Sequence, residues 1–180
     1  MFAEDAGTNE SAKNLLKELF DQKAVFETPK PVSLVEILLQ MSCQSGIAMD
    51  FFAGSGVLAH AVMNLNASDG NLRQSVSVQI GEDVPFDSEA AKAGYSTITE
   101  IAKERIRRAG HKILEGECHP DWNKDVGFRV LKIDSSNMAD VFYAPDETTQ
   151  AGLLDFVDNI KPDRTPEDLL FQVLLDWGVD

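Results

Sequence analysis

The sequence predicts an α/β domain in which helices alternate with the strands of a mostly parallel sheet. Two stretches of strand length, the apolar 47–52 and the alternating apolar and polar 74–80, are separated by a stretch of helical length that begins at two closely spaced glycines. A third strand-like stretch follows at 128–133. Because such alternation makes the strands parallel and places helices on both sides of them, we expect a sheet that is covered on both faces.

The segment before the first strand contains two expected helices with an extended stretch between them. Residues 11–20 carry leucines and a phenylalanine at helical spacing. Residues 26–31 (FETPKP) must be extended, since two prolines exclude a helix there. Ser33 and Glu36 form an S-x-x-E pattern, which predicts a capping box and a helix that runs to about Ser42.

The first strand, the next helix and the second strand follow from length and periodicity. The stretch 47–52 (IAMDFF) is short, apolar and followed by glycines, which indicates a buried strand. Residues 56–65 predict a helix that begins directly at the glycines. In the stretch 74–80, apolar and polar residues alternate, as is typical of a strand.

The remaining elements are indicated by capping patterns and a short apolar run. Thr97 and Glu100 form a second capping box, and we expect the helix that it opens to end before Gly110. The stretch 128–133 (FRVLKI) predicts a third strand. Residues 165–168 (TPED) place a proline at the first position of a helix that continues to about residue 177.

Length, composition and charge narrow the class of protein. The chain has 180 residues, of which 43% are apolar, which suits one globular domain or a large piece of one. Its net charge of −14 disfavours binding to nucleic-acid phosphates. No apolar run reaches membrane length, the acidic N-terminus is unlike a secretory signal, and two cysteines are too few for a disulfide framework. We therefore expect a cytoplasmic protein.

The segment 50–56 (DFFAGSG) predicts a cofactor-binding turn. Glycines let the backbone turn sharply and let a ligand come close to the main chain. The helix that follows directs its free N–H groups towards such a ligand. In open α/β sheets, ligands bind at the carboxyl ends of the strands, where this turn lies. A glycine turn that binds no ligand remains the alternative.

Three kinds of cofactor bind at glycine turns of this type. A Walker-type phosphate loop is excluded because the chain has no G-x-x-x-x-G-K-[ST] run. Residues 54–59 match the dinucleotide pattern G-x-G-x-x-[GA], but the next strand ends near Gln79 and lacks the acidic residue that this fingerprint requires. S-adenosylmethionine-dependent methyltransferases place an acidic residue next to an F-x-G-x-G turn, as Asp50 and residues 52–56 do. The turn alone is therefore compatible with both a dinucleotide and S-adenosylmethionine.

Seven collinear segments match one family: 7–10 (GTNE), 26–34 (FETPKPVSL), 50–56 (DFFAGSG), 59–70 (AHAVMNLNASDG), 90–95 (AAKAGY), 100–110 (EIAKERIRRAG) and 127–137 (GFRVLKIDSSN). Together they resemble the C-terminal part of the modification (Mod) subunit of bacterial type III restriction–modification systems. These subunits are adenine-specific DNA methyltransferases. The resemblance implies a partial Rossmann-like, S-adenosylmethionine-dependent methyltransferase sheet with helices on both faces. Residues 1–140 would be the cofactor-binding part, and 141–180 a C-terminal helical segment that starts a further region.

The resemblance also implies the residues that hold the cofactor. Three residues of FETPKP would line its methionine end, and the turn would pass beneath its sugar and amino-acid portion. Asp50 would orient this backbone or the methionine ammonium. Gln79 stands where related enzymes often carry a glutamate for the ribose hydroxyls. The expected set is Thr28, Lys30, Pro31, Asp50, Phe52, Ala53, Gly54, Ser55, Gly56 and Gln79. No metal ligands are expected.

One family motif is absent from these residues. Adenine methyltransferases of this class hold the target amine in a [DNS]-P-P-[YFW] motif, and the chain contains no Pro-Pro pair. We therefore expect no catalytic residues in it, although the family is enzymatic. The chain looks truncated, by design or in nature. It would bind DNA weakly or not at all, while the full-length protein would bind DNA and a restriction subunit.

A partial sheet would leave an open edge and apolar surface, so we also expect self-association. Two other readings remain open. One is a non-catalytic remnant that binds a partner or its own copies. The other is a dinucleotide-dependent oxidoreductase, against which Gln79 and the FETPKP segment argue.

Overall fold

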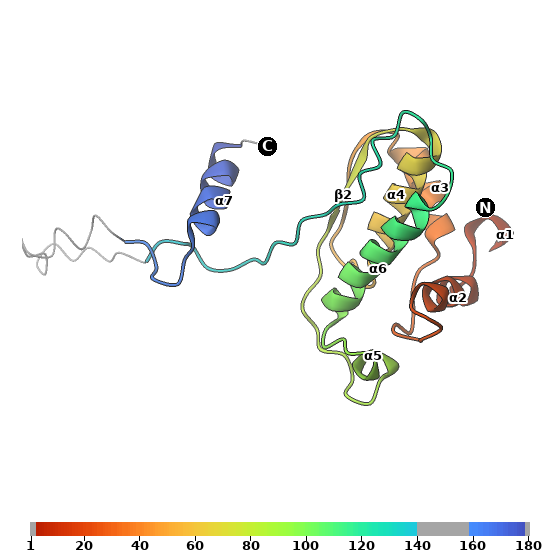
Figure 1. Cartoon of the computed structure of the whole chain (residues 1–180), viewed down its shortest axis with the longest axis horizontal. Coiled ribbons are helices and arrows are strands. Elements are labelled where there is room, and N and C mark those ends of the chain that lie inside the picture. The colour runs from red at the N-terminus through yellow and green to blue at the C-terminus, as the bar shows by residue number, and fades with distance from the viewer. Residues whose placement is uncertain (1–2, 140–158, 179–180) are drawn as a thin grey trace, which may run out of the picture. The chain divides into compact units, whose positions relative to one another are not determined.

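Figure 1 shows the computed structural model of the chain, which describes residues 3–139 and 159–178. The chain divides into two compact units, residues 1–128 and 129–180. The boundary expected at 140 lies outside the described residues. The elements are α1 (Ala3–Ala6), α2 (Asn9–Leu19), α3 (Val32–Ser42), β1 (Gly46–Asp50), α4 (Val57–Asp69), β2 (Arg73–Ser77), α5 (Glu89–Lys92), α6 (Ile98–Leu114) and α7 (Pro166–Trp177).

The described strands, β1 and β2, pair in parallel, as the alternation of elements predicts. Their register runs from Gly46 opposite Arg73 to Asp50 opposite Ser77. Pairing continues past the strand ends, because the Val78 N–H donates to the Asp50 carbonyl at 2.8 Å. The glycine turn therefore leaves β1 at the carboxyl end of the sheet.

Helix α4 is the centre of the first unit and is buried along most of its length. One side packs against α3 through a cluster that includes Val57, Leu58 and Ala61, and Ala48 of β1 packs against this cluster. The other side packs against α6 through Ala59 and Met63. A helix that is apolar on nearly all sides is suited to such an interior position.

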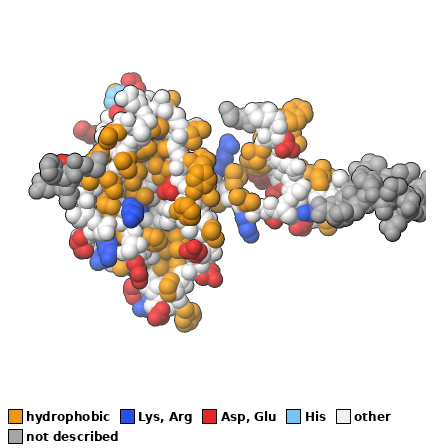
Figure 2. All heavy atoms as spheres, turned by 180° about the vertical axis from the view of Figure 1, so that it is seen from behind, with side chains coloured by type: hydrophobic (Ala, Val, Ile, Leu, Met, Phe, Trp, Pro, Cys, Tyr) orange, Lys and Arg blue, Asp and Glu red, His pale blue; other side chains and the backbone are white. Residues whose placement is uncertain are grey.

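The expectation that helices cover both faces of the sheet is wrong for the described residues. Ala48 faces the helices, whereas Ile47, Met49 and Val76 are 65%, 52% and 38% exposed. Ile47 and Met49 alternate with Ala48 along β1, so they lie on the opposite face. Met49 pairs with Val76 of β2. We call these three residues the open sheet face; Figure 2 shows hydrophobic side chains gathered on one side of the first unit.

The third strand expected at 128–133 does not form. These residues have no strand assignment, and Val130, Leu131 and Ile133 are 59%, 68% and 93% exposed. A short run rich in apolar residues favours an extended backbone, but a strand also requires a neighbouring edge to pair with. The sequence pattern supplies the first condition, and no described segment supplies the second.

Two helix boundaries also differ from expectation. Ser33 is not an N-cap, because α3 begins at Val32 and its N-cap is Pro31. The Ser33 hydroxyl instead donates a hydrogen bond to the Ala6 carbonyl at 2.9 Å. Gly110 does not end α6, which continues to Leu114. A Cβ at Gly110 would lie 2.9 Å from the Cβ of Val126, so this glycine serves close packing within a helix.

The other capping predictions are confirmed. Thr97 and Glu100 form the capping box of α6. Thr165 caps α7, with Pro166 at the first helical position, and Asp168 completes a further box. Glu104 and Arg108, four residues apart on α6, form an ion pair at 2.7 Å. No helix among the described residues is long and apolar enough to cross a membrane.

Candidate functional site

The DFFAGSG turn adopts the backbone conformation for which its glycines are required. Gly54 and Gly56 have φ angles of +50° and +79°, in the left-handed region that residues with a Cβ rarely adopt. The Asp50 carboxylate accepts a hydrogen bond from the Phe52 N–H at 2.9 Å. This carboxylate therefore orients the backbone at the point where the chain leaves β1, one of the two roles expected of it.

Gln79 holds the turn from the neighbouring strand. The Gly54 N–H donates to Gln79 Oε1 at 2.8 Å, and Gln79 Nε2 donates to the Ile80 carbonyl at 3.2 Å. The side chain expected to face a cofactor sugar thus also fixes the central glycine. A glutamate could make the first bond but not the second, because it has no N–H to donate.

The N-terminus of α4 has no side-chain cap. Its N-cap is Gly56, in the left-handed conformation, and Val57 and Leu58 are both buried in the α3–α4 cluster. The first N–H groups of a helix lack partners within the helix and carry partial positive charge. In this chain they are left for an acceptor outside the helix, such as the carboxylate of a ligand.

Helix α6 supports the turn from the protein interior. A Cβ at Gly56 would lie 3.4–3.5 Å from atoms of Ala102 and Ile106, so α6 packs directly against the turn, while the left-handed backbone is what requires glycine there. Arg105 Nη1 donates to Ser55 Oγ at 2.7 Å, and both side chains are buried. Burial lowers the pKa of Arg105 to about 10.

His60 lies one turn into α4 and is also buried. Burial, with a smaller contribution from the positive charge of Arg105, lowers the pKa of His60 to about 3. No described residue hydrogen-bonds its Nδ1. Sequence reasoning identified neither Arg105 as a support of the turn nor this buried neutral imidazole. Arg105 lies 50 residues from Ser55 and falls in a helix whose charged residues look solvent-facing.

The FETPKP segment reaches the turn through its phenylalanine. A Cβ at Gly54 would lie 3.4 Å from Phe26 Cζ. Pro31 is buried as the N-cap of α3. Thr28 and Lys30 are exposed and form no hydrogen bond with a described residue. Sequence reasoning missed Phe26, whose place within FETPKP was the available signal.

The structure brings most of the expected cofactor residues together. Bonds within the turn or across it join Asp50, Phe52, Gly54 and Gln79. Ala53, Ser55 and Gly56 are buried beneath the same turn. The exposed ring of Phe52, at 87%, stands beside these backbone groups. The result is a largely buried turn at the end of the sheet, with the N-terminus of α4 on one side and the exposed ring of Phe52 on the other.

Comparison with known proteins agrees with this geometry. A family model described as DNA methylase matches residues 4–113. The Mod subunit of the type III restriction–modification enzyme StyLTI from Salmonella typhimurium is 39% identical over 127 residues, or 70% of this chain. The EcoP15I Mod subunit from Escherichia coli is 41% identical over 124 residues, or 68%. The type II methyltransferase M.KpnI from Klebsiella pneumoniae is 34% identical over 98 residues, covering 54% of this chain and 23% of that protein.

The matched region covers 19% of the StyLTI subunit and 18% of the EcoP15I subunit, so the chain spans about a fifth of the length of these relatives. The family model, by contrast, covers more than half of this chain and includes β1, the turn, α4, β2 and most of α6. The elements that build the turn are thus the ones that the family shares. This chain belongs to the DNA methylase family and is similar to the Mod subunits of type III restriction–modification enzymes.

Proposed function

We propose that this chain is the S-adenosylmethionine-binding portion of a site-specific DNA (adenine-N6) methyltransferase of a type III restriction–modification system. The observation that carries the proposal is the turn after β1, where Gly54 and Gly56 have left-handed backbones and α4 begins without a side-chain cap. The family match over residues 4–113 supports a methyl donor as the ligand.

The residues present fit this cofactor. Its methionine carboxylate suits the uncapped N–H groups of α4. Its ammonium group suits the Asp50 carboxylate, which keeps acceptor capacity beyond its bond to the Phe52 N–H. Gln79 would hydrogen-bond the ribose hydroxyls with its remaining N–H while it braces Gly54. Thr28, Lys30 and Pro31 would line the methionine end. When bound, the cofactor supplies the methyl group; the chain's own residues bind and orient it.

The chain alone is proposed not to methylate DNA. Its 180 residues lack the Pro-Pro pair of the motif that would hold the target adenine. In a full-length Mod protein, this cofactor-binding portion would act beside the motif that holds the adenine. The full-length protein would bind DNA and a restriction subunit. A methyl-transfer assay on adenine-containing duplex DNA tests this point, and turnover by the isolated chain would refute it.

The open sheet face supports a further part of the proposal, namely self-association. Parallel sheets are normally covered on both faces, whereas Ile47 and Met49 of β1 are exposed. A second copy of the chain would remove these side chains from water. This also describes the alternative function, a non-catalytic remnant that associates with itself or with a partner.

One calorimetric experiment separates the candidates. The chain is titrated with S-adenosylmethionine and, separately, with NAD. Saturable binding of S-adenosylmethionine alone supports the proposed function. NAD binding alone supports an oxidoreductase, for which Gln79 lacks the required charge. If the chain binds neither compound, the result supports the alternative of a non-catalytic remnant.

A further inference from the structure

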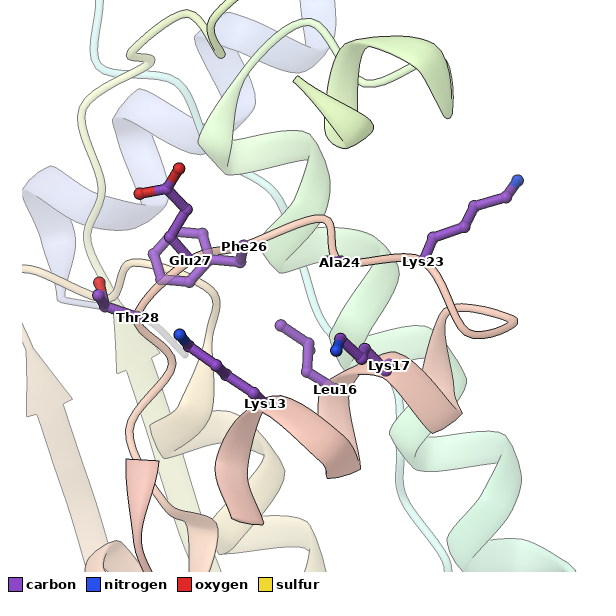
Figure 3. Close-up of a pocket in the computed structure, with 8 residues that line it drawn as sticks. All are labelled: Lys13, Leu16, Lys17, Lys23, Ala24, Phe26, Glu27 and Thr28. Carbon is purple, nitrogen blue, oxygen red and sulfur yellow. The ribbon is translucent and has the colours of Figure 1, made fainter. Parts of the chain in front are cut away.

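Three lysines line a pocket beside α2. The pocket has a volume of about 380 Å³, and it is lined by Lys13, Leu16, Lys17, Lys23, Ala24, Phe26, Glu27 and Thr28. Lys13 and Lys17 stand one helical turn apart on α2, and Lys23 lies in the loop that follows. Figure 3 shows Lys13 and Lys17 extending from α2 and Lys23 pointing outward from the loop.

The three pocket lysines have no ion-pair partner among the described residues, which distinguishes them from Lys92 and Lys112 but not from Lys30, Lys103 and Lys124 of the same unit. Lys92 pairs with Glu89 at 2.8 Å, and Lys112 pairs with Glu18 at 3.7 Å. None of the three pocket lysines forms an ion pair with a carboxylate of the described residues, although the chain has 30 acidic and only 16 basic residues. What sets the three apart is that they line one pocket, which also holds the carboxylate of Glu27.

The arrangement suits an extended anion better than a compact one. The Lys13 and Lys17 positions are about 6 Å apart along the helix axis, and Lys23 points away from both in Figure 3. A single phosphate would require the ammonium groups to converge on one point. A row of phosphates can pair with ammonium groups that are spread apart.

The pocket adjoins the proposed cofactor site through Phe26. This ring lines the pocket and also contacts the turn, since its Cζ lies 3.4 Å from where a Cβ of Gly54 would be. Thr28, another pocket residue, belongs to the segment expected to line the methionine end of the cofactor. A polyanion bound along the lysines would therefore pass beside the site of the methyl donor.

We propose that Lys13, Lys17 and Lys23 bind successive phosphates of the DNA backbone. The inference rests on the proposed function, because it takes DNA as the polyanion. The net charge of −14 lowers the affinity of the whole chain for DNA, whereas the three lysines supply local contacts with phosphates. The chain then contributes to the DNA interface as well as to cofactor binding.

The test is fluorescence anisotropy of a labelled DNA duplex with this chain over a series of salt concentrations. A variant with Lys13→Gln, Lys17→Gln and Lys23→Gln is compared with a control that has the same change in charge, Lys92→Gln, Lys103→Gln and Lys112→Gln. Each lost phosphate contact reduces the slope of log affinity against log salt by about 0.9. We expect the pocket variant to lose about two to three units of slope and at least ~10-fold in affinity at low salt.

The control variant is expected to keep a slope close to that of the original chain. An equal loss in both variants would show that only net charge matters, and would overturn the inference. Absence of salt-dependent DNA binding by the original chain would also overturn the inference. Calorimetric titration of the pocket variant with S-adenosylmethionine separates the two proposals, since its cofactor affinity should equal that of the original chain. If neither the original chain nor the pocket variant binds S-adenosylmethionine, the proposed function is refuted, whatever the result with DNA.

Discussion

The guanidinium of Arg105 and the hydroxyl of Ser55 form a buried hydrogen bond of 2.7 Å beneath the glycine turn. Arg105 is 1% exposed and Ser55 is 3% exposed. Arg105 Nε has no hydrogen-bond partner among the described residues, so the bond to Ser55 is a main attachment of this side chain. It fixes the turn to α6, a helix that lies some 40 residues further along the chain and contributes no residue to the motif itself.

This bond predicts coupled effects of substitution. Arg105→Met and Ser55→Ala should each weaken S-adenosylmethionine binding, because each frees the turn from α6. Hydrogen bonds to charged groups contribute about 1.5–3 kcal/mol, so a double-mutant cycle on the free energy of unfolding should show a coupling of about 1 kcal/mol or more. Strictly additive effects would mean that the bond does not support the turn.

His60 predicts a loss of stability in mild acid. Its pKa is about 3 in the folded chain and 6.5 as a reference. The folded state therefore favours the neutral imidazole, and this stability is complete above pH 6.5 and falls as the pH decreases towards 3. The loss is about 1.4 kcal/mol per pH unit, or about 2 kcal/mol between pH 6.5 and pH 4.5. Urea unfolding of the original chain and of His60→Leu at both pH values measures it.

The His60→Leu variant should be less sensitive to pH over this range. The carboxyl groups whose pKa values are lowered, such as that of Asp69, contribute at lower pH, because protonation in the unfolded state begins near its reference value of 3.8. Parallel losses of stability in the original chain and the variant between pH 6.5 and pH 4.5 would contradict the assignment to His60.

The open sheet face predicts concentration-dependent association. Sedimentation of the original chain should show oligomers, and Met49→Lys should shift it towards monomer because a charge there resists burial. Phe86→Lys is the control, since Phe86 is 98% exposed and belongs to the loop between β2 and α5 and not to the sheet. A clean monomer at high concentration, or equal effects of both substitutions, would count against association through this face.

Local sequence signals predicted the elements whose causes are local. The capping box of Thr97 and Glu100 and the proline start at Pro166 depend on residues within one turn, and both are confirmed. The prediction that the helix ends before Gly110 is wrong, because this glycine allows close contact with Val126, a residue 16 positions further along the chain. Residues 128–133 show the same limit, since strand formation depends on a neighbouring edge.

The candidate site divides in the same way. Its glycine turn and the acceptor at Asp50 are readable because they are contiguous in sequence. The brace from Gln79 to Gly54 spans 25 residues, and the support of Ser55 by Arg105 spans 50. Such contacts follow from how α4 and α6 pack, which no local pattern encodes.

Gln79 predicts opposite effects of two substitutions on cofactor affinity. Gln79→Glu keeps an acceptor for the Gly54 N–H and adds charge assistance to hydrogen bonds with ribose hydroxyls. We expect it to tighten S-adenosylmethionine binding by about 3- to 10-fold, roughly 1 kcal/mol. Gln79→Leu removes the brace and should weaken binding by at least that factor. Calorimetry measures both, and a Gln79→Leu variant that binds as well as the original chain would contradict the role of this side chain.

The central claim is that the turn from Asp50 to Gly56 binds S-adenosylmethionine. Isothermal titration of the original 180-residue chain with this cofactor tests it most directly, with Asp50→Ala as the comparison. We expect saturable binding at one site per chain, and at least ~10-fold weaker binding by Asp50→Ala, since that variant loses both the bond to the Phe52 N–H and the acceptor for the ammonium group. Absence of binding by the original folded chain, or equal binding by the variant, would contradict the account.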